Sequence, residues 1–382
     1  MNHKATRVAY FGPDARDAAI KRRIQSMLHV GFRVRAYMMR RQEDMEHGWD
    51  NVDLGFVRHV AFVRRLGAIA RAVVISLRDR AELRQADVWI ARNLDLLVVA
   101  FLVRKFLSVR APLVYECLDI HRLMTRTDWV GRVVRHAERR MLKDCADVIV
   151  SSPGFVREYF ASYYGEGLHA TIIENRMPTG GIADPRPSEL DFQAGDRPRV
   201  LGWYGVLRCQ RSLDLMCALA RGLPDRIRVR LHGFTKPEDL PRFEEQISGL
   251  NNLVFKGRYR YPDDLPAIYG GVDLVWAGDF HDALFNSRWL LPNRLYEGGY
   301  FGVVPIAPKN SETGRWIYEK DVGFVVDEPI EQTLPKLLSE LTAQAIAKKR
   351  KNLLATPIDV FIQPREEIED YINGLLGARQ PL

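Results

Sequence analysis

The segment RVAYFGPDARDAAIKRRIQSMLHVGFRVRAYMM, residues 7 to 39, decides the fold class of this chain. A β-rich run leads through a polar loop into a helical stretch, and a second β-rich run follows. This order predicts a strand over Arg7–Gly12, a helix over residues 18–31 and a strand over residues 32–39. Strands joined by a helix are typical of a parallel sheet covered by helices.

The same alternation continues outward from this segment in two series. Between them lies RMPTGGIADPRPSELDFQAGDRPR, which is rich in Pro and Gly and has no apolar period. The first series has a helix at residues 134–145 and further strands at 86–92, 111–119, 147–152 and 170–175. The second series has strands at 199–205, 226–233, 252–257, 272–278, 302–308 and 323–326.

Two such series predict two Rossmann-like domains. We place the N-terminal domain at residues 1–178, the linker at 179–198, the C-terminal domain at 199–355 and a C-terminal helical segment at 356–382. Open α/β sheets bind ligands at the carboxyl ends of their strands. Two domains of this kind therefore predict a ligand cleft between facing parallel sheets.

Composition and cysteine usage limit the environment of the chain. With 382 residues, 47% of them hydrophobic and 27% charged, it is long enough for two packed domains. The four cysteines have no C-x-x-C spacing, which fits a reducing compartment. The N-terminus lacks a signal-peptide run, and the longest apolar run, residues 94–103, is too short and interrupted to span a bilayer. These features predict a cytoplasmic protein.

The net charge of +8 is concentrated in the first half of the chain. Residues 1–175 hold 29 basic and 20 acidic groups, whereas the remainder holds 27 and 28. The basic, apolar segments 56–80 and 101–110 suit an anionic membrane surface. Core helices with solvated arginines are the alternative. No nucleic-acid-binding module is present, so we predict a peripheral position at the inner face of the cell membrane and no nucleic-acid partner.

The segment NSRWLLPNRLYEGGYFGVVPIA, residues 286–307, carries the most specific motif. It resembles the P-N-K-L-x-E and G-x-P-V-I signature of GT-B glycosyltransferases of family 4, also called group 1. The resemblance implies that Glu297 accepts hydrogen bonds from the ribose hydroxyls of a nucleotide-sugar and that Asn293 and Arg294 face its diphosphate. A carboxylate can accept two such hydroxyl donors at once. Many family members have a further glutamate eight residues earlier, where this chain has Trp289.

Two other segments of the second half resemble donor-binding loops of the same family. GWYGVLRCQRSLDL, residues 202–215, is similar to the G-R-L-x-x-x-K-G loop, which implies that Gly205, Arg208 and Arg211 bind the diphosphate at a helix entrance. The second basic residue comes three positions after Arg208 instead of five. NLVFKGRYRYPDD, residues 252–264, is similar to the base-binding loop, which implies that Arg258 and Tyr259 meet the nucleobase.

In the first half, VYECLDIHR puts Glu116, Asp119 and His121 at the carboxyl end of a predicted strand. An inverting glycosyltransferase needs a base for the acceptor hydroxyl, and a retaining one needs a polar group near the reacting carbon. We predict Asp119 as the base, with His121 next. A helix cap beside an exposed histidine is the alternative.

The loop after the first strand contains Asp14, Arg16 and Asp17, which we predict to contact the acceptor. No histidine or cysteine cluster has metal-ligand spacing, and no convincing D-x-D strand end is present. The G-x-x-x-x-G-K-[ST] and G-x-G-x-x-G loops are also absent, which disfavours kinases and NAD enzymes. We therefore expect no cofactor and no metal.

The wording of several segments is most similar to GT-B glycosyltransferases of exopolysaccharide biosynthesis. This resemblance implies transfer of a hexose from a nucleotide-sugar, with a UDP-sugar such as UDP-glucose as the first candidate, to a lipid-linked saccharide. It also implies that the C-terminal helix crosses back to the first domain. Two alternatives stay open: a UDP-sugar 2-epimerase-like enzyme, and a non-catalytic nucleotide-sugar-binding subunit associated with the membrane.

Overall fold

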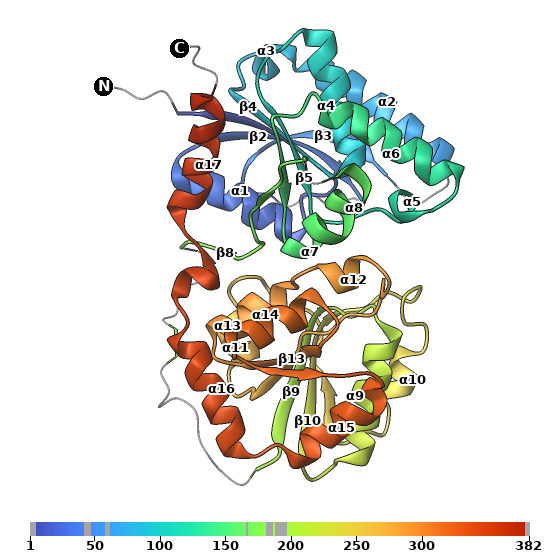
Figure 1. Ribbon diagram of the computed structural model, residues 1–382, viewed down its shortest axis with the longest axis vertical. Helices are drawn as coiled ribbons and strands as arrows, with labels where there is room; N and C mark the ends of the chain where they lie inside the picture. The colour runs from blue at the N-terminus through green and yellow to red at the C-terminus, as the bar shows by residue number, and fades with distance from the viewer. Residues whose placement is uncertain are drawn as a thin grey trace. The chain divides into compact units, whose positions relative to one another are not determined.

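The computed structural model describes residues 5–41, 47–57, 62–165, 167–180, 186–187 and 197–378, without the side chains of residues 62–64. The chain divides into two compact units. The first comprises Met1–Thr179 together with Gln363–Leu382, and the second comprises Gly180–Ile362. Most of the predicted linker, residues 179–198, lies outside the described residues. Figure 1 shows that each unit has a sheet with helices on its faces.

The first unit is built on a parallel sheet with the strand order β3-β2-β1-β4-β5-β6-β7. Because β1 lies between β2 and β4, the chain runs toward one edge of the sheet first and toward the other from β4 onward. The loops after β1 and β4 therefore diverge at the carboxyl edge. The strands are β1 (Arg7–Gly12), β2 (Arg33–Arg40), β3 (Asp50–Phe56), β4 (Val88–Arg92), β5 (Leu113–Cys117), β6 (Asp147–Val150) and β7 (Thr171–Ile172).

Strand β3 is the one element of this sheet that the sequence does not predict. Its sequence DNVDLGF mixes acidic residues with a glycine at φ 95° and lacks apolar alternation. The strand forms because it lies at the edge of the sheet, where Asp50 and Asp53 pair with arginines of β2. The distances are 2.6 Å from Asp50 to Arg35 and 3.0 Å from Asp53 to Arg40. Charged side chains are common on such edges.

Helices cover both faces of the first sheet. Figure 1 shows α2, α4 and α6 stacked side by side on one face, while α1 and α17 pack together on the other. The helices are α1 (Ala18–Val30), α2 (Phe62–Arg78), α3 (Arg80–Leu83), α4 (Asn93–Leu107), α5 (Arg122–Thr125), α6 (Trp129–Leu142), α7 (Pro153–Phe155), the π-helix η1 (Val156–Phe160), α8 (Ala161–Tyr164) and α17 (Arg365–Gly377).

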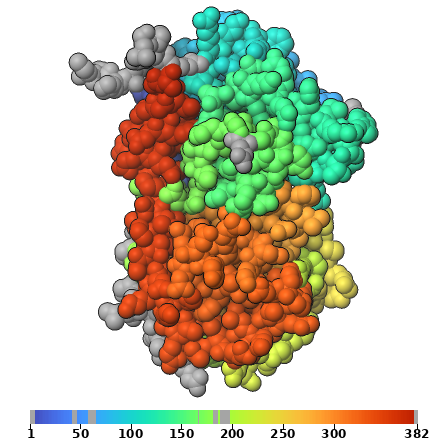
Figure 2. Space-filling model, viewed as in Figure 1, coloured from blue at the N-terminus to red at the C-terminus, as the bar shows by residue number. Residues whose placement is uncertain are grey.

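The C-terminal helix α17 belongs to the first unit because it completes that unit's core. Ile368 and Ile372 are fully buried in one cluster with Ile20, Ile24 and Met27 of α1. Figure 2 shows α17 in red at the surface of this unit. Burying two isoleucine side chains stabilises this arrangement by about 3–6 kcal/mol.

The second unit has a parallel sheet of its own, with the order β11-β10-β9-β12-β13-β14. At its carboxyl edge β9 and β10 approach closely: a Cβ on Gly233 would lie 1.8 Å from the carbonyl oxygen of Gly205. Only glycine fits there. The strands are β9 (Arg199–Val206), β10 (Ile227–Phe234), β11 (Leu253–Phe255), β12 (Leu274–Trp276), β13 (Val304–Pro308) and β14 (Phe324–Val326). Two-residue strands β8 (Met177–Pro178) and β15 (Ile362–Gln363) pair separately.

The helices of the second unit pack around this sheet over a core rich in Leu and Ile. The prediction of an α/β chain with two Rossmann-like sheets is confirmed. No helix in the described part of the chain is long and apolar enough to cross a membrane. The helices are α9 (Gln210–Gly222), α10 (Phe243–Ile247), α11 (Leu265–Tyr269), α12 (Asn286–Trp289), α13 (Asn293–Tyr300), α14 (Glu312–Lys320), α15 (Ile330–Glu340), α16 (Ala343–Ala355) and the 3₁₀ helix η3 (Ile358–Val360).

Candidate functional site

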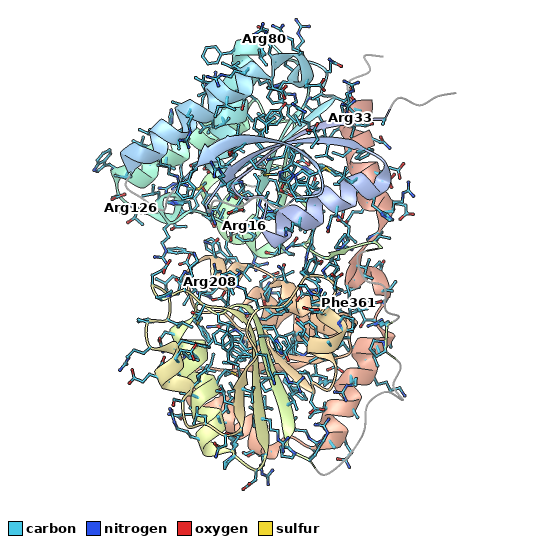
Figure 3. The ribbon with its side chains drawn as sticks, turned by 180° about the vertical axis from the view of Figure 1, so that it is seen from behind. Arg16, Arg33, Arg80, Arg126, Arg208 and Phe361 are labelled. Atoms are coloured by element: carbon cyan, nitrogen blue, oxygen red, sulfur yellow. The ribbon has the colours of Figure 1, made fainter. Side chains whose placement is uncertain are left out.

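The loop after β1 brings the three predicted acceptor contacts together at the carboxyl edge of the first sheet. Asp14 is buried and accepts hydrogen bonds from Arg16, at 3.0 Å from its amide and 3.3 Å from its guanidinium. Asp17 caps α1 by accepting from the amides of Ala19 and Ile20. Figure 3 labels Arg16, which lies in this loop. The structure thus gives both aspartates a role in shaping the loop.

Glu116 lies at the end of β5 but is fully buried. One carboxylate oxygen is 2.7 Å from Nε of Arg23, and the other accepts a hydrogen bond from the hydroxyl of Tyr10. Arg23 belongs to α1, and the Tyr10 side chain packs in the core beneath α1. Because side chains alternate along a strand, the Glu116 side chain points to this face of the sheet. The burial and the two bonds argue against the predicted catalytic role, and we assign Glu116 to the support of the fold.

Glu116→Gln is expected to lower the free energy of unfolding of the first unit by about 3–5 kcal/mol, because it leaves the buried guanidinium of Arg23 without its counter-charge. Thermal or urea unfolding measures the change. The matched control is Asp327→Asn, which breaks an exposed ion pair with Lys309 and should leave the unfolding midpoint unchanged. Equal midpoints for wild type and Glu116→Gln would contradict the assignment.

Asp119 and His121 follow β5 at the same edge of the sheet, and both are exposed. Burial opposes the charge of Arg92 at the end of β4, yet nearby acids that include Asp119 raise the Arg92 pKa. β4 and β5 are neighbouring strands, so Arg92 and Asp119 come from the same edge of the sheet. An exposed carboxylate at a strand end can take a proton from a hydroxyl, which is what the predicted base requires.

Two donors face the ring of His121. Nδ1 is 3.2 Å from the amide nitrogen of Leu123, which makes His121 the cap of α5, and Nε2 is 2.8 Å from the guanidinium of Arg65. A neutral imidazole has one accepting nitrogen, so the ring accepts from only one of these donors at a time. Arg65 is also paired with Asp95 of α4. Burial and the Arg65 charge lower the pKa of His121, so the ring is neutral at pH 7. The structure thus shows the helix cap that the alternative interpretation predicts. The role of His121 in catalysis stays a prediction.

In the second unit, Gly205 and Arg208 lie at the carboxyl end of β9, directly before α9. Gly205 has φ 108°, a conformation that favours glycine. The side chain of Arg208 is 39% exposed, and its guanidinium is 3.5 Å from Asp279. A half-exposed arginine at the entrance of a helix can bind an anionic group.

Arg211 is placed differently from the prediction. Its guanidinium forms ion pairs of 2.7 Å with both Glu328 and Glu331 and lies 4.5 Å from the ring centre of Phe280. A diphosphate would have to displace two carboxylates from this group. The geometry therefore argues against Arg211 as a diphosphate ligand and leaves Arg208 as the basic residue of this loop.

The resemblance to family 4 implies that this loop binds the diphosphate of a nucleotide such as UDP. On that prediction, Arg208→Ala is expected to weaken UDP binding about 10- to 100-fold, since a charge-assisted hydrogen bond contributes about 1.5–3 kcal/mol. Arg211→Ala serves as the matched variant on the same loop and should change the affinity less than about threefold. Isothermal titration of UDP into each protein compares the two. A larger loss in Arg211→Ala than in Arg208→Ala would contradict the reassignment.

Asp279, which the sequence analysis did not single out, organises the loop after β12. It is nearly buried and accepts from the amide of His281 at 2.8 Å and the hydroxyl of Ser287 at 3.2 Å, beside Arg208. Burial opposes its ionisation, but Arg208 and Arg294 lower the pKa of Asp279 below its usual value. The signal in the sequence was an aspartate three residues after a buried strand.

Asn293 and Arg294 begin α13. The guanidinium of Arg294 donates to the carbonyl oxygens of Trp276 at 2.8 Å and Gly278 at 2.6 Å. These bonds tie α13 to the loop after β12, so the predicted role of Arg294 at the diphosphate gives way to a structural one. Asn293 is half-buried at the first helical position.

Glu297 lies in the middle of α13 and is 3% exposed. Its carboxylate accepts a 2.9 Å hydrogen bond from the hydroxyl of Tyr269, whose ring stacks on Phe301. Burial and the Glu297 charge hold the pKa of Tyr269 well above its usual value, so the phenol stays protonated and donates. Trp289, at the position of the second family glutamate, is buried against Phe285.

Arg258 and Tyr259 follow β11, after Gly257 at φ 73°. Arg258 is exposed, with its guanidinium 4.2 Å from the ring centre of Phe234, and Tyr259 is half-buried. The two predicted base contacts thus lie in one turn at the carboxyl edge of the second sheet. Their orientation toward a base stays a prediction.

Solved structures of glycosyltransferases share this fold. Alr3699/HepE from Anabaena, determined with UDP and glucose, superposes with a TM-score of 0.70 at 16% identity over 98% of this chain and all of HepE. Sucrose-phosphate synthase from Thermosynechococcus elongatus has a TM-score of 0.73 at 14% identity over 98% of this chain and all of the synthase. WaaG, a glycosyltransferase of lipopolysaccharide biosynthesis, has a TM-score of 0.64 at 17% identity, over 96% of this chain and all of WaaG.

Comparison with models of known protein families finds no match. A curated protein is similar along nearly the whole chain: the succinoglycan biosynthesis protein ExoL of Rhizobium meliloti (strain 1021) is 37% identical over 373 residues, which are 96% of this chain and 93% of ExoL. The chain belongs to the family of ExoL. Its fold is that of the GT-B glycosyltransferases. The predicted fold class and the predicted resemblance are confirmed.

For this ExoL-family protein, the two units differ in the chemistry of their candidate residues. Asp119 and His121 lie exposed after β5 in the first unit, whereas the second unit has half-exposed Arg208 after β9 and buried Glu297 on α13. Among the residues that the structure describes, no three His, Cys, Asp or Glu side chains are grouped as a metal site.

Proposed function

We propose that the protein transfers a hexose from a UDP-sugar, with UDP-glucose as the first candidate, to a lipid-linked saccharide during exopolysaccharide assembly. The observation that carries the proposal is that the second unit places Arg208 at the carboxyl end of β9 and Glu297 on α13, which follows β12, the neighbour of β9 in the sheet. A guanidinium and a carboxylate suit the diphosphate and ribose of a nucleotide-sugar. HepE, solved with UDP-glucose, and ExoL, named for succinoglycan biosynthesis, support the choice of substrates.

In the proposed reaction an acceptor hydroxyl attacks the anomeric carbon of the donor sugar. The new glycosidic bond forms as the bond to the β-phosphate oxygen breaks, and UDP leaves. In an inverting enzyme Asp119 takes the hydroxyl proton. In a retaining one the β-phosphate oxygen of the leaving UDP takes that proton, and Asp119 stays as a polar group beside the reacting carbon. His121 is the second candidate. We propose that the chain's own charges suffice and that no metal or other cofactor takes part.

The acceptor proposal is tested with lipid-linked saccharides extracted from a Rhizobium meliloti strain that lacks ExoL. The purified protein should extend these lipids with hexose from UDP-glucose in the presence of EDTA. UDP-, GDP-, dTDP- and ADP-glucose are first ranked by thermal shift, since a ligand stabilises the fold by RT ln(1 + [L]/Kd). Release of free sugar or of an epimer without lipid extension would instead favour the epimerase-like alternative.

We propose that the protein works at the cytoplasmic face of the membrane and binds anionic lipid through the solvent face of α6. Trp129 and Val133 on this face are 68% and 59% exposed, and Arg132 lies exposed beside them. The only acidic residue within α6, Glu138, is buried. Apolar and basic side chains on one exposed helix face suit an anionic interface.

Trp129→Gln is expected to reduce co-sedimentation with phosphatidylglycerol vesicles several-fold, because tryptophan favours the lipid headgroup region. Leu284→Gln is the matched control, since Leu284 of the second unit is 73% exposed and lies on no basic helix. Phosphatidylcholine vesicles should bind the wild type weakly. Equal binding of both vesicle types, or of both variants, would contradict the proposed surface.

A further inference from the structure

The carboxyl end of β4 lies at the point where the first sheet changes direction. In the order β3-β2-β1-β4, the loops after β1 and β4 leave the sheet toward opposite edges, and open α/β sheets bind ligands between such loops. Arg92 ends β4, and its Nη2 reaches Asp17 in the loop after β1 at 3.4 Å. This one contact joins the two loops.

Arg92 is 3% exposed, and two of its three guanidinium nitrogens lack a partner. Among the residues that the structure describes, neither Nε nor Nη1 finds a hydrogen-bond acceptor. Buried donors of this kind are rare, because an unmade hydrogen bond to a charged group is costly. Their position at the sheet edge favours completion by a bound ligand.

The next residue, Asn93, also has a buried polar atom without a partner among the described residues, in this case a hydrogen-bond acceptor. Its φ of 65° is left-handed, a conformation uncommon outside glycine, and its buried Oδ1 has no partner among the described residues. Strained backbone is concentrated at ligand-binding positions. Two consecutive residues therefore carry unsatisfied hydrogen-bonding atoms: donors on Arg92 and an acceptor on Asn93.

The charges around this point disfavour an anion. Asp17 lies 3.4 Å from Arg92, and the charges of Asp17, Glu116 and Asp119 raise the pKa of its guanidinium. The Arg65–Asp95 ion pair, in which Asp95 follows Asn93 on α4, is balanced in charge. A phosphate would have to compete with carboxylates already present for Arg92. Sugar hydroxyls both donate and accept, and they suit a mixed set of guanidinium, amide and carboxylate groups.

We propose that Arg92 and Asn93 form a subsite for the hydroxyl groups of the acceptor's terminal sugar. Nε and Nη1 of Arg92 donate to sugar oxygens, and Oδ1 of Asn93 accepts from a hydroxyl. Asp119 follows β5, the strand next to β4, at the same edge of the sheet. The inference rests on the proposed function and names residues that bind its acceptor.

The test uses two variants and one matched control. Arg92→Lys keeps the charge beside Asp17 but loses the guanidinium donors. Asn93→Gly removes Oδ1, and glycine adopts the φ of 65° without strain. Ser108→Gly is the control, because exposed Ser108 ends the same helix α4 with φ 53°.

The probe is the lipid-linked saccharide extract of the ExoL-deficient strain, dispersed in detergent, and its binding is measured without donor. We expect affinity to fall about tenfold in Arg92→Lys and about fivefold in Asn93→Gly, as for lost hydrogen bonds in a polar site. Ser108→Gly should bind as wild type, and the UDP affinity should stay constant in all four proteins.

The outcomes separate this inference from the proposed function. Unchanged extract binding in both Arg92→Lys and Asn93→Gly, or an equal loss in Ser108→Gly, overturns the subsite, as does a wild-type protein that does not bind the extract. If extract binding depends on Arg92 and Asn93 but UDP-glucose is not a donor, the proposed reaction fails and the subsite stands.

Discussion

Replacing Asp119 by asparagine is expected to lower kcat about 10²- to 10⁴-fold, the usual contribution of a general base. The asparagine amide cannot take the proton of the acceptor hydroxyl, although the size of the side chain is unchanged. UDP-glucose binding should stay intact, because Asp119 lies in the first unit and the proposed donor contacts, Arg208 and Glu297, lie in the second. The loss should therefore appear in single-turnover transfer and be absent from UDP titration.

Two further substitutions make this result specific. His121→Gln tests the second candidate for the base. It should lower kcat less than Asp119→Asn does if the carboxylate is the base. Asp128→Asn, which removes another acidic side chain after β5, is the control and should leave kcat unchanged. Wild-type turnover in Asp119→Asn would rule out the carboxylate as the base.

Glu297→Gln is expected to weaken UDP binding about 10- to 100-fold. A carboxylate accepts two ribose hydroxyls in charge-assisted bonds of about 1.5–3 kcal/mol, whereas a glutamine amide offers one oxygen without charge. Glutamine keeps the size of the side chain and its contact with Tyr269, so the fold should persist. Titration with UDP and 2′-deoxy-UDP measures the effect.

The deoxy-nucleotide makes the assignment specific. Wild type should prefer UDP over 2′-deoxy-UDP. Glu297→Gln should lose most of that preference, because removing the ribose hydroxyl and removing the carboxylate charge each break the same hydrogen bond. Glu312→Gln, at another buried glutamate of the second unit, should retain it. An undiminished preference in Glu297→Gln would place the ribose elsewhere.

Local sequence patterns predicted most of the fold because the signals for a buried strand or a helix lie in residues that are close together in the sequence. Apolar runs predicted the buried strands β1, β4, β5 and β9, and their alternation with helices predicted the parallel order. Strand β3 was missed because its pairing depends on β2, in particular on Arg35 and Arg40. Edge strands need no apolar run, so nothing local distinguishes them from loops.

The residues of the candidate site also fall into those that local motifs predict and those whose role depends on distant contacts. Motif spacing selected Glu297, Arg208 and Asp119 as candidates, since these positions depend on short segments next to strand ends. Spacing also selected Arg211 and Glu116, whose side chains the structure engages elsewhere. Arg211 meets Glu328 and Glu331 more than a hundred residues away, and Glu116 turns into the α1-covered face toward Arg23.

Local patterns along the chain are enough to predict the two α/β sheets, the strand ends that carry polar residues and the resemblance to GT-B glycosyltransferases. Which of those polar groups have partners, and which are left to meet a ligand, depends on contacts between distant segments. The reason is physical: hydrophobic periodicity is a property of neighbouring residues, whereas burial and ion pairing depend on segments that meet only when the chain folds. The sequence placed Arg92 and Asn93 at a strand end, and the burial of their unpartnered polar atoms made them candidates for a ligand site.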